Sequence, residues 1–140
     1  MKTNLVQGLN ESAKEIHAIN KAKGFWDKEK NIGELLMLVT SELGEALEAD
    51  RKNKHADLEN FELNVGKTEE LRNNLGKIVS KDNYAVHFKT FVKDTFEDEI
   101  ADAVIRLLDL SAGLGIDIEK HINAKVEYNK TRPRLHGKTY

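Results

Sequence analysis

Two stretches of this chain combine a helical hydrophobic pattern with a pair of carboxylates, and together they constrain the fold most strongly. The first stretch covers residues 33–50 and the second covers residues 96–110. Because residues three apart lie on one face of a helix, each acid pair should project from a single face, one turn apart. The acids are Glu42 and Glu45 in the first stretch and Glu99 and Asp102 in the second.

If the two predicted helices lie side by side, these four carboxylates converge. Four acids in one place need protons, basic partners or a metal ion, because their charges repel one another. A site made of oxygen ligands alone favours a hard cation such as Mg²⁺. The same pattern is also found in ordinary solvent-facing charges on amphipathic helices, so the pattern alone leaves both interpretations open.

The remaining sequence predicts further helices and no convincing strand. Its single proline, Pro133, lies close to the C-terminus, so no proline interrupts a helix upstream of it. A length of 140 residues suits one domain with its own hydrophobic core. We therefore expect an all-α protein, a single domain over residues 1–140 that forms a bundle of four main helices. The expected helices are 3–23, ended by Gly24; 31–52, begun by a capping box of Asn31 and Glu34; a third from 94 or 95 to Gly113 and Gly115; and a fourth capped by Asp117.

Residues 53–94 are polar and predict an insertion between the second and third main helices. Gly66 and Gly76 are expected to interrupt it. We expect this insertion to be partly helical and to pack against the bundle edge, or to serve as an oligomer interface or a lid. The expected elements are a helix over 69–79 capped by Thr68 and a helix over 83–93 capped by Asp82.

Composition excludes several classes of partner. The formal net charge is −2 and 33% of the residues are charged, so no nucleic-acid polymer is expected as a partner. The absence of cysteine excludes disulfides and thiolate metal sites. The longest apolar run, Leu35 to Val39, is too short to span a bilayer, and the N-terminal segment has no apolar stretch typical of a signal peptide. We therefore expect a cytoplasmic protein with no membrane partner.

A second set of residues has the chemistry to bind an anionic ligand that carries a ring. Lys125 and Asn129 lie four apart on the fourth helix, and Arg132 follows closely. Near a magnesium site these residues would suit a polyphosphate, whereas the simpler interpretation is a helix end followed by a solvated basic tail. Phe25 and Trp26 are adjacent aromatics in a polar connection. They either close the end of the bundle, or Trp26 forms a flat pocket for a base.

Other metal chemistries fit the sequence less well. A di-iron bundle needs a histidine three residues after a glutamate on two of its helices. None of the five histidines has a glutamate at that spacing. They are also too scattered along the chain to predict a zinc site.

In this order and context, the motifs resemble those of the MazG-like all-α nucleoside triphosphate pyrophosphohydrolases. The family signature is a Glu-x-x-Glu helix followed by a Glu-x-x-Asp helix, and it falls on the four acids named above. A lysine and an asparagine four apart on the next helix also match, at Lys125 and Asn129. The matching segments cover about half of the chain and are residues 24–27, 31–52, 94–122 and 125–140.

The resemblance implies a helical bundle that assembles as a dimer or as a tetramer built from dimers. It implies hydrolysis of nucleoside triphosphates to the monophosphate and pyrophosphate, which would clear unwanted nucleotides. It implies that the four carboxylates hold Mg²⁺, with Mn²⁺ able to replace it, and that Glu42 or Glu45 orients or deprotonates the attacking water. The expected substrate ligands are Lys125 and Arg132 for the phosphates and Trp26 and Asn129 for the base and sugar.

Three features depart from the family pattern. Ser41 stands where many members have a second glutamate, so one carboxylate is missing next to the first motif. The connection over residues 53–94 is longer than in compact members, and Arg106 stands where some relatives have a tyrosine. Ser41 and the long connection favour an alternative, a non-enzymatic helical module that binds a nucleotide or a protein. A phosphoribosyl-ATP pyrophosphohydrolase is a further alternative within the same chemistry.

Overall fold

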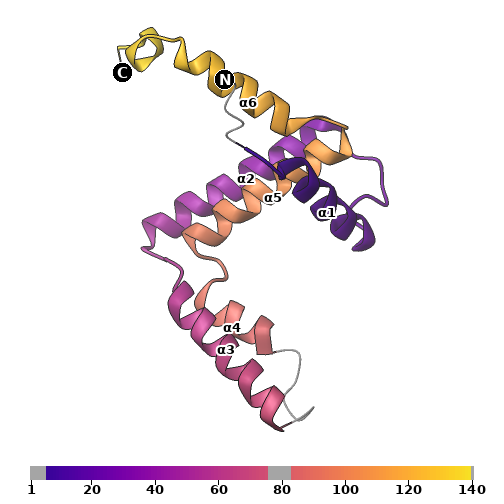
Figure 1. The fold of residues 1–140 in the computed structure, drawn as a ribbon, viewed down its shortest axis with the longest axis vertical. Coiled ribbons are helices and arrows are strands. Elements are labelled where there is room, and N and C mark those ends of the chain that lie inside the picture. Colours follow the sequence, from indigo (N-terminus) through magenta and orange to yellow (C-terminus); the bar gives the residue numbers. More distant parts are fainter. Residues whose placement is uncertain (1–5, 76–82, 140) are drawn as a thin grey trace. The chain divides into compact units, whose positions relative to one another are not determined.

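The computed structural model describes residues 6–75 and 83–139, and all regular secondary structure in these residues is helical. The all-α class is therefore confirmed. Within the same residues, no helix combines the length and the apolar character that crossing a bilayer requires. The elements, labelled in Figure 1, are α1 (Leu9–Ala22), α2 (Ile32–Arg51), α3 (Leu58–Leu75), α4 (Asn83–Phe91), α5 (Phe96–Gly113), α6 (Ile118–Lys130) and the short 3₁₀ helix η2 (Arg134–Gly137).

The chain divides into two compact units. The first comprises Met1–Leu35 and Ile105–Tyr140, and the second comprises Leu36–Val104. Helices α2 and α5 contribute residues to both units, while α1 and α6 belong to the first and α3 and α4 to the second. The single domain and the four-helix bundle stay predictions.

Several predicted helix ends are confirmed. Asn31 and Glu34 form the expected capping box: the Glu34 N–H donates to Asn31 Oδ1 at 2.9 Å, and the Asn31 N–H donates to Glu34 Oε2 at 3.3 Å. Gly24 follows α1 with a φ of +86°, and Gly115 follows α5 with a φ of +66°. Both values lie in the left-handed region that glycine adopts without a steric cost, so these residues end the helices as the sequence predicts.

Helix α1 starts later than the sequence predicts, and its start is tied to α6 in the first unit. Gly8, with a φ of +75°, precedes α1, so the helix begins at Leu9. Residues 3–5 of the predicted helix lie outside the described residues. The Asn10 side chain donates to Asp117 Oδ1 at 2.7 Å, which joins the two helix starts. Asp117 also accepts from the Lys120 N–H at 3.0 Å, which confirms its predicted role as the cap of α6.

The main correction to the sequence analysis concerns the insertion. The predicted start of the helix over 69–79 is wrong, because α3 begins at Leu58 and Thr68 lies inside it. Residues 69–75 are helical as predicted, and residues 76–79 lie outside the described residues. Asp57 provides the start of α3, where its Oδ1 accepts from the Asn60 N–H at 3.0 Å. The Thr68 hydroxyl lies 3.0 Å from His87 Nε2 on α4, so its side chain contacts a neighbouring helix and caps nothing.

Helices α3 and α4 pack together through aromatic rings in the second unit. Phe61 is buried, and its ring makes edge contacts with Tyr84 at 5.2 Å and with Phe88 at 5.9 Å between ring centroids. This small core explains why the described parts of this polar segment, α3 and α4, form helices that pack together. The predicted helix over 83–93 is present as α4, whereas its predicted cap Asp82 and the predicted break at Gly76 lie outside the described residues.

Candidate metal centre and neighbouring cavity

Three of the four predicted acids come together in the second unit. Oxygen atoms of Glu42 and Glu45 on α2 and of Glu99 on α5 all lie within 4.8 Å of one another. The fourth acid, Asp102, lies one helical turn after Glu99 and is half-buried, but it is not a member of this compact group. The structure thus brings both glutamates of α2 and the first acid of α5 to one site.

Two of these acids occupy positions that normally hold core residues. Glu42 is 6% exposed and continues the buried stripe of α2 that includes Val39 and Ala46. Glu99 is 5% exposed and lies one turn before the buried Ala103 on α5. The sequence predicts acids at the border of the buried face, and the observed burial is deeper than that. Burying a carboxylate is costly unless a proton or a cation compensates its charge.

The electrostatics of the group favour such compensation. Burial, the charge of Glu45 and a hydrogen bond with Glu42 together raise the pKa of Glu99 from 4.5 to about 7, and burial is the largest of these causes. The nearby charge of Asp102 acts likewise. At neutral pH the Glu99 carboxyl therefore retains a proton for part of the time. A divalent cation would replace that proton and relieve the repulsion, so these three oxygen-bearing side chains fit Mg²⁺ or another hard cation.

The raised pKa predicts how the stability of the metal-free protein depends on pH. The folded state holds the Glu99 proton more tightly than the unfolded chain, so this stabilisation is complete below pH 4.5 and is lost as the pH rises through about 7. We expect the free energy of unfolding in chelator to fall by up to about 3 kcal/mol over this range from this group. Denaturant titrations at several pH values measure the effect.

The matched variants for this test are Glu99→Gln and Glu62→Gln. Glutamine at position 99 cannot titrate, so the decline between pH 4.5 and 7 should flatten. Glu62 is an exposed glutamate of α3, and its replacement should leave the wild-type decline in place. A wild-type decline that persists in Glu99→Gln would show that another group causes it.

A second group of acids also includes Glu99, but hydrogen bonds and an ion pair at the start of α5 account for its other two members. Oxygen atoms of Asp94, Asp98 and Glu99 also approach within 4.8 Å. Asp98 accepts from the Asp94 N–H at 2.9 Å, and Asp94 forms an ion pair of 2.6 Å with Lys93. These contacts are those of an acidic helix start, where backbone N–H groups need acceptors. The first group contains two buried glutamates, Glu42 and Glu99, so it is the stronger candidate for a cation.

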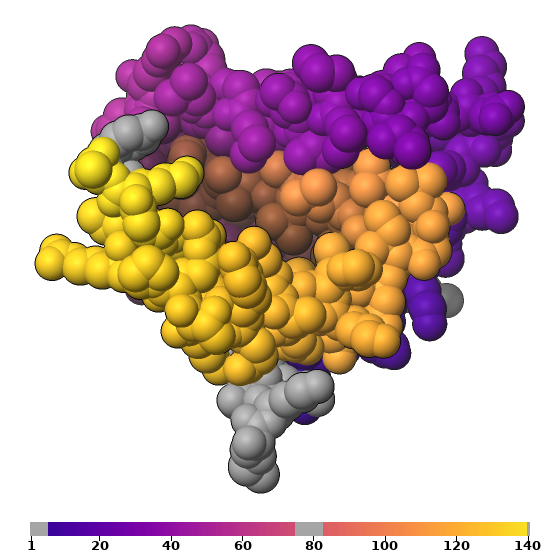
Figure 2. All heavy atoms as spheres, turned by 90° about the horizontal axis from the view of Figure 1, so that it is seen from above, coloured from indigo at the N-terminus to yellow at the C-terminus, as the bar shows by residue number. Residues whose placement is uncertain are grey.

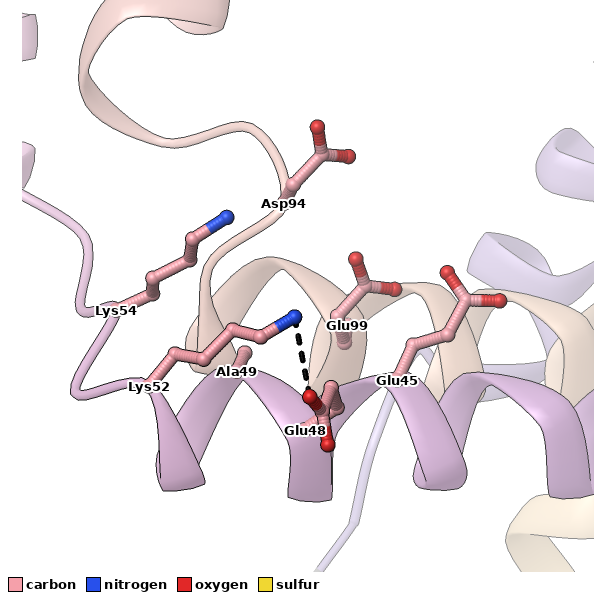
Figure 3. A pocket seen from close by; sticks show the side chains of 7 residues that line it. All are labelled: Glu45, Glu48, Ala49, Lys52, Lys54, Asp94 and Glu99. Carbon is pink, nitrogen blue, oxygen red and sulfur yellow. Dashed lines mark ion pairs between the residues drawn. The ribbon is translucent and has the colours of Figure 1, made fainter.

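An open cavity of about 200 Å³ lies next to the three-acid group in the second unit. Figure 3 shows Glu45 and Glu99 at one end and the Lys54 ammonium at the other, with the Lys52 ammonium between them. Lys52 forms an ion pair of 3.0 Å with Glu48, marked in the figure by a dashed line. The cavity is lined by Glu45, Glu48, Ala49, Lys52, Lys54, Asp94 and Glu99. Neither lysine was predicted as a site residue, although Lys52 lies seven residues, or two helical turns, after Glu45.

The predicted phosphate ligands belong to the first unit, on α6 and the residues after it. The side chains of this segment, yellow in Figure 2, are exposed or half-exposed. The Lys125 ammonium lies 4.9 Å from the centre of the Tyr128 ring, and the Arg132 guanidinium lies 5.8 Å from it. The buried Asn129 Oδ1 atom has no hydrogen-bond partner among the described residues. The Tyr128 ring thus contacts both a cation on α6 and a cation just after its end.

Trp26 is held by a polar network within the first unit. Its Nε1–H donates to both oxygens of Asp109, at 3.0 and 3.1 Å. Asp109 also accepts from His17 Nδ1 at 2.7 Å and from Asn20 Nδ2 at 2.8 Å. A Cβ atom at Gly113 would lie 2.5 Å from Trp26 Cη2, so the indole ring rests against bare backbone. This packing explains an aromatic residue in a polar connection, while base binding by Trp26 stays a prediction.

Comparisons of the chain with protein-family models, curated proteins and solved structures give no match. The resemblance to MazG-like pyrophosphohydrolases therefore rests on the residues described above and stays a prediction.

Proposed function

We propose that this protein is a Mg²⁺-dependent pyrophosphohydrolase that converts nucleoside or deoxynucleoside triphosphates to the monophosphate and pyrophosphate. The observation that supports this proposal is the group formed by Glu42, Glu45 and Glu99, two of which are buried at core positions of their helices. A helix that carries a carboxylate in its buried stripe loses stability, which is expected where the carboxylate serves a ligand.

The three glutamates would hold the cation, with Asp102 as a further ligand from the next turn of α5. When bound, Mg²⁺ or Mn²⁺ supplies positive charge for the phosphate oxygens and lowers the pKa of a water molecule. Glu45 is the exposed member of the group and lines the cavity, so it is the residue best placed to orient that water and accept its proton. Glu42 is buried and better suited to positioning the cation.

The substrate ligands of the proposal are those of α6 and its surroundings. The cations at Lys125 and Arg132 suit phosphate oxygens, and the unpartnered Asn129 Oδ1 supports a polar ligand near the helix end. Trp26 is proposed to contact the base.

Assembly into a homodimer or homotetramer is part of the same proposal. Leu36, Leu43 and Leu47 lie along one face of α2, and each is about half exposed: 48%, 50% and 52%. A row of exposed leucines at helical spacing is typical of a helix that packs against another protein chain.

The first test is pyrophosphate release from a panel of ribonucleoside and deoxyribonucleoside triphosphates. We expect release from a subset of the panel with Mg²⁺, retained activity with Mn²⁺, and none in the presence of chelator, because the carboxylates cannot act on phosphate without a cation. The panel also identifies the base and the sugar. No release from any triphosphate, in a folded sample that binds Mg²⁺, would contradict the proposed hydrolysis.

A second function, a binding module without catalysis, is favoured by Ser41. Its hydroxyl donates to the Leu38 carbonyl at 2.7 Å and is exposed, so it does not replace the glutamate that many family members carry there. Nucleotide binding without any hydrolysis over days would support this alternative. Turnover that disappears in the acid variants would exclude it.

A further inference from the structure

The cavity beside the three-acid group separates charge in a way that suits a metal-bound anion. Glu45 and Glu99 lie at the end that would hold the cation, the Lys54 ammonium lies at the other end, and the Lys52 ammonium lies between them (Figure 3). An anion that binds the cation at one end can extend its remaining oxygens towards the lysines. A chain of phosphates has this charge and this extended form.

The backbone of Lys54 is fixed on both sides. Its N–H donates to the Ala49 carbonyl at the end of α2, at 2.9 Å, and its carbonyl accepts from the Phe96 N–H at the start of α5, also at 2.9 Å. Asn53, with a φ of +52°, makes the tight turn between α2 and Lys54. The Lys54 side chain therefore starts from a point set by the same two helices that carry the acids.

The other charges around this end of the cavity already have partners. Lys52 is paired with Glu48 at 3.0 Å, and Asp94 is paired with Lys93 at 2.6 Å. Among residues 6–75 and 83–139, no carboxylate lies within ion-pair distance of the Lys54 ammonium. A cation that lines a cavity and has no partner there is available for an anionic ligand.

We propose that Lys54 binds the pyrophosphate portion of the substrate and of the product, at the end of the cavity opposite the metal centre. Lys52 adds a second, weaker contact because Glu48 already shares its charge. This inference rests on the proposed function, since the cation at the three-acid group is needed to hold the other end of the phosphate chain. It gives the second unit a phosphate ligand of its own, in addition to those proposed on α6.

Calorimetric titration with magnesium pyrophosphate tests this assignment without any turnover. In Lys54→Ala the dissociation constant should rise by roughly 5- to 20-fold, as expected for one charge-assisted contact in an open site. Lys54→Arg, which keeps the charge, should bind within about threefold of the wild type. The matched control is Lys67→Ala, which removes an exposed lysine from α3 in the same unit and should leave the affinity unchanged.

Two further measurements separate this inference from the proposed hydrolysis. Binding of Mg²⁺ alone should not weaken in Lys54→Ala, because the lysine contacts the anion and not the cation. If the wild type hydrolyses triphosphates, KM should rise in Lys54→Ala in step with the pyrophosphate dissociation constant.

The outcomes are distinct. Unchanged pyrophosphate affinity in Lys54→Ala, an equal loss in Lys67→Ala, or no pyrophosphate binding by the wild type would each overturn the role of Lys54, whatever the turnover. Binding that depends on Lys54 in a protein without turnover would support the phosphate site and reject the hydrolysis.

Discussion

Replacing Glu42 with glutamine should lower pyrophosphate release by at least about 100-fold, because the variant loses a buried charged ligand of the cation that polarises the phosphates. Glutamine has nearly the same shape, so the helices should remain intact. Asp102→Asn should act in the same direction from α5. The measurement is the initial rate of pyrophosphate release at saturating Mg²⁺, with circular dichroism to check the helical content.

Stability measurements show whether this loss arises from the site or from unfolding. Glu42 contributes to the repulsion that raises the pKa of Glu99, so metal-free Glu42→Gln should be at least as stable as the wild type at pH 8. At a Mg²⁺ concentration of about 100 times the dissociation constant, the wild type should gain about 2.7 kcal/mol, and the variant should gain much less.

Glu62→Gln provides the control for Glu42→Gln, because it makes the same substitution at an exposed position of α3. This variant should retain wild-type activity and the full gain in stability from Mg²⁺. Wild-type turnover in Glu42→Gln would reject the proposed metal centre. If Glu42→Gln is inactive because it has lost its helices, the expectation that this substitution leaves the fold intact is wrong.

The local features of this protein follow from its sequence because they depend on residues a few positions apart. The capping box of Asn31 and Glu34 and the Asp117 cap form within single helix starts. The spacing of Glu42 and Glu45 fixes their shared face in the same way. The all-α class follows from such local patterns summed over the chain, and it is confirmed.

The insertion was predicted less well because tertiary contacts outweigh local signals there. Gly66 costs about 1 kcal/mol inside a helix relative to alanine, yet α3 continues through it. The aromatic contacts of Phe61 with α4 provide a compensating stabilisation that periodicity within α3 does not reveal. Thr68 is a good capping residue by type, but its hydroxyl contacts His87.

The candidate site shows the same division between local and distant contacts. The acid pairs could be recognised from their spacing on each helix. The position of Lys54 beside them depends on backbone hydrogen bonds to both α2 and α5, and no spacing rule predicts such contacts. The partners of Asp109 lie even further away in sequence: Trp26 is separated from it by 83 residues and His17 by 92 residues.

That distant network gives the largest expected effect on stability. Replacing Asp109 with alanine removes the acceptor for His17, Asn20 and Trp26 at once and leaves three half-buried donors without their partner. We expect the free energy of unfolding to fall by about 2 to 4 kcal/mol, because each unsatisfied donor costs about 1 kcal/mol or more. Trp26 is the single tryptophan of the chain, so denaturation followed by its fluorescence reports directly on this network.

A matched substitution, Asp50→Ala, distinguishes this network from a general effect of removing an aspartate. Asp50 is exposed near the end of α2, so its replacement should change the stability by no more than about 0.5 kcal/mol. The folded Asp109→Ala variant should also show altered tryptophan emission, because Trp26 loses the acceptor of its Nε1–H and gains contact with water. An Asp109→Ala variant with wild-type stability and emission would mean that water satisfies the three donors equally well. The connection carrying Trp26 would then be held by packing against Gly113 and His17 alone.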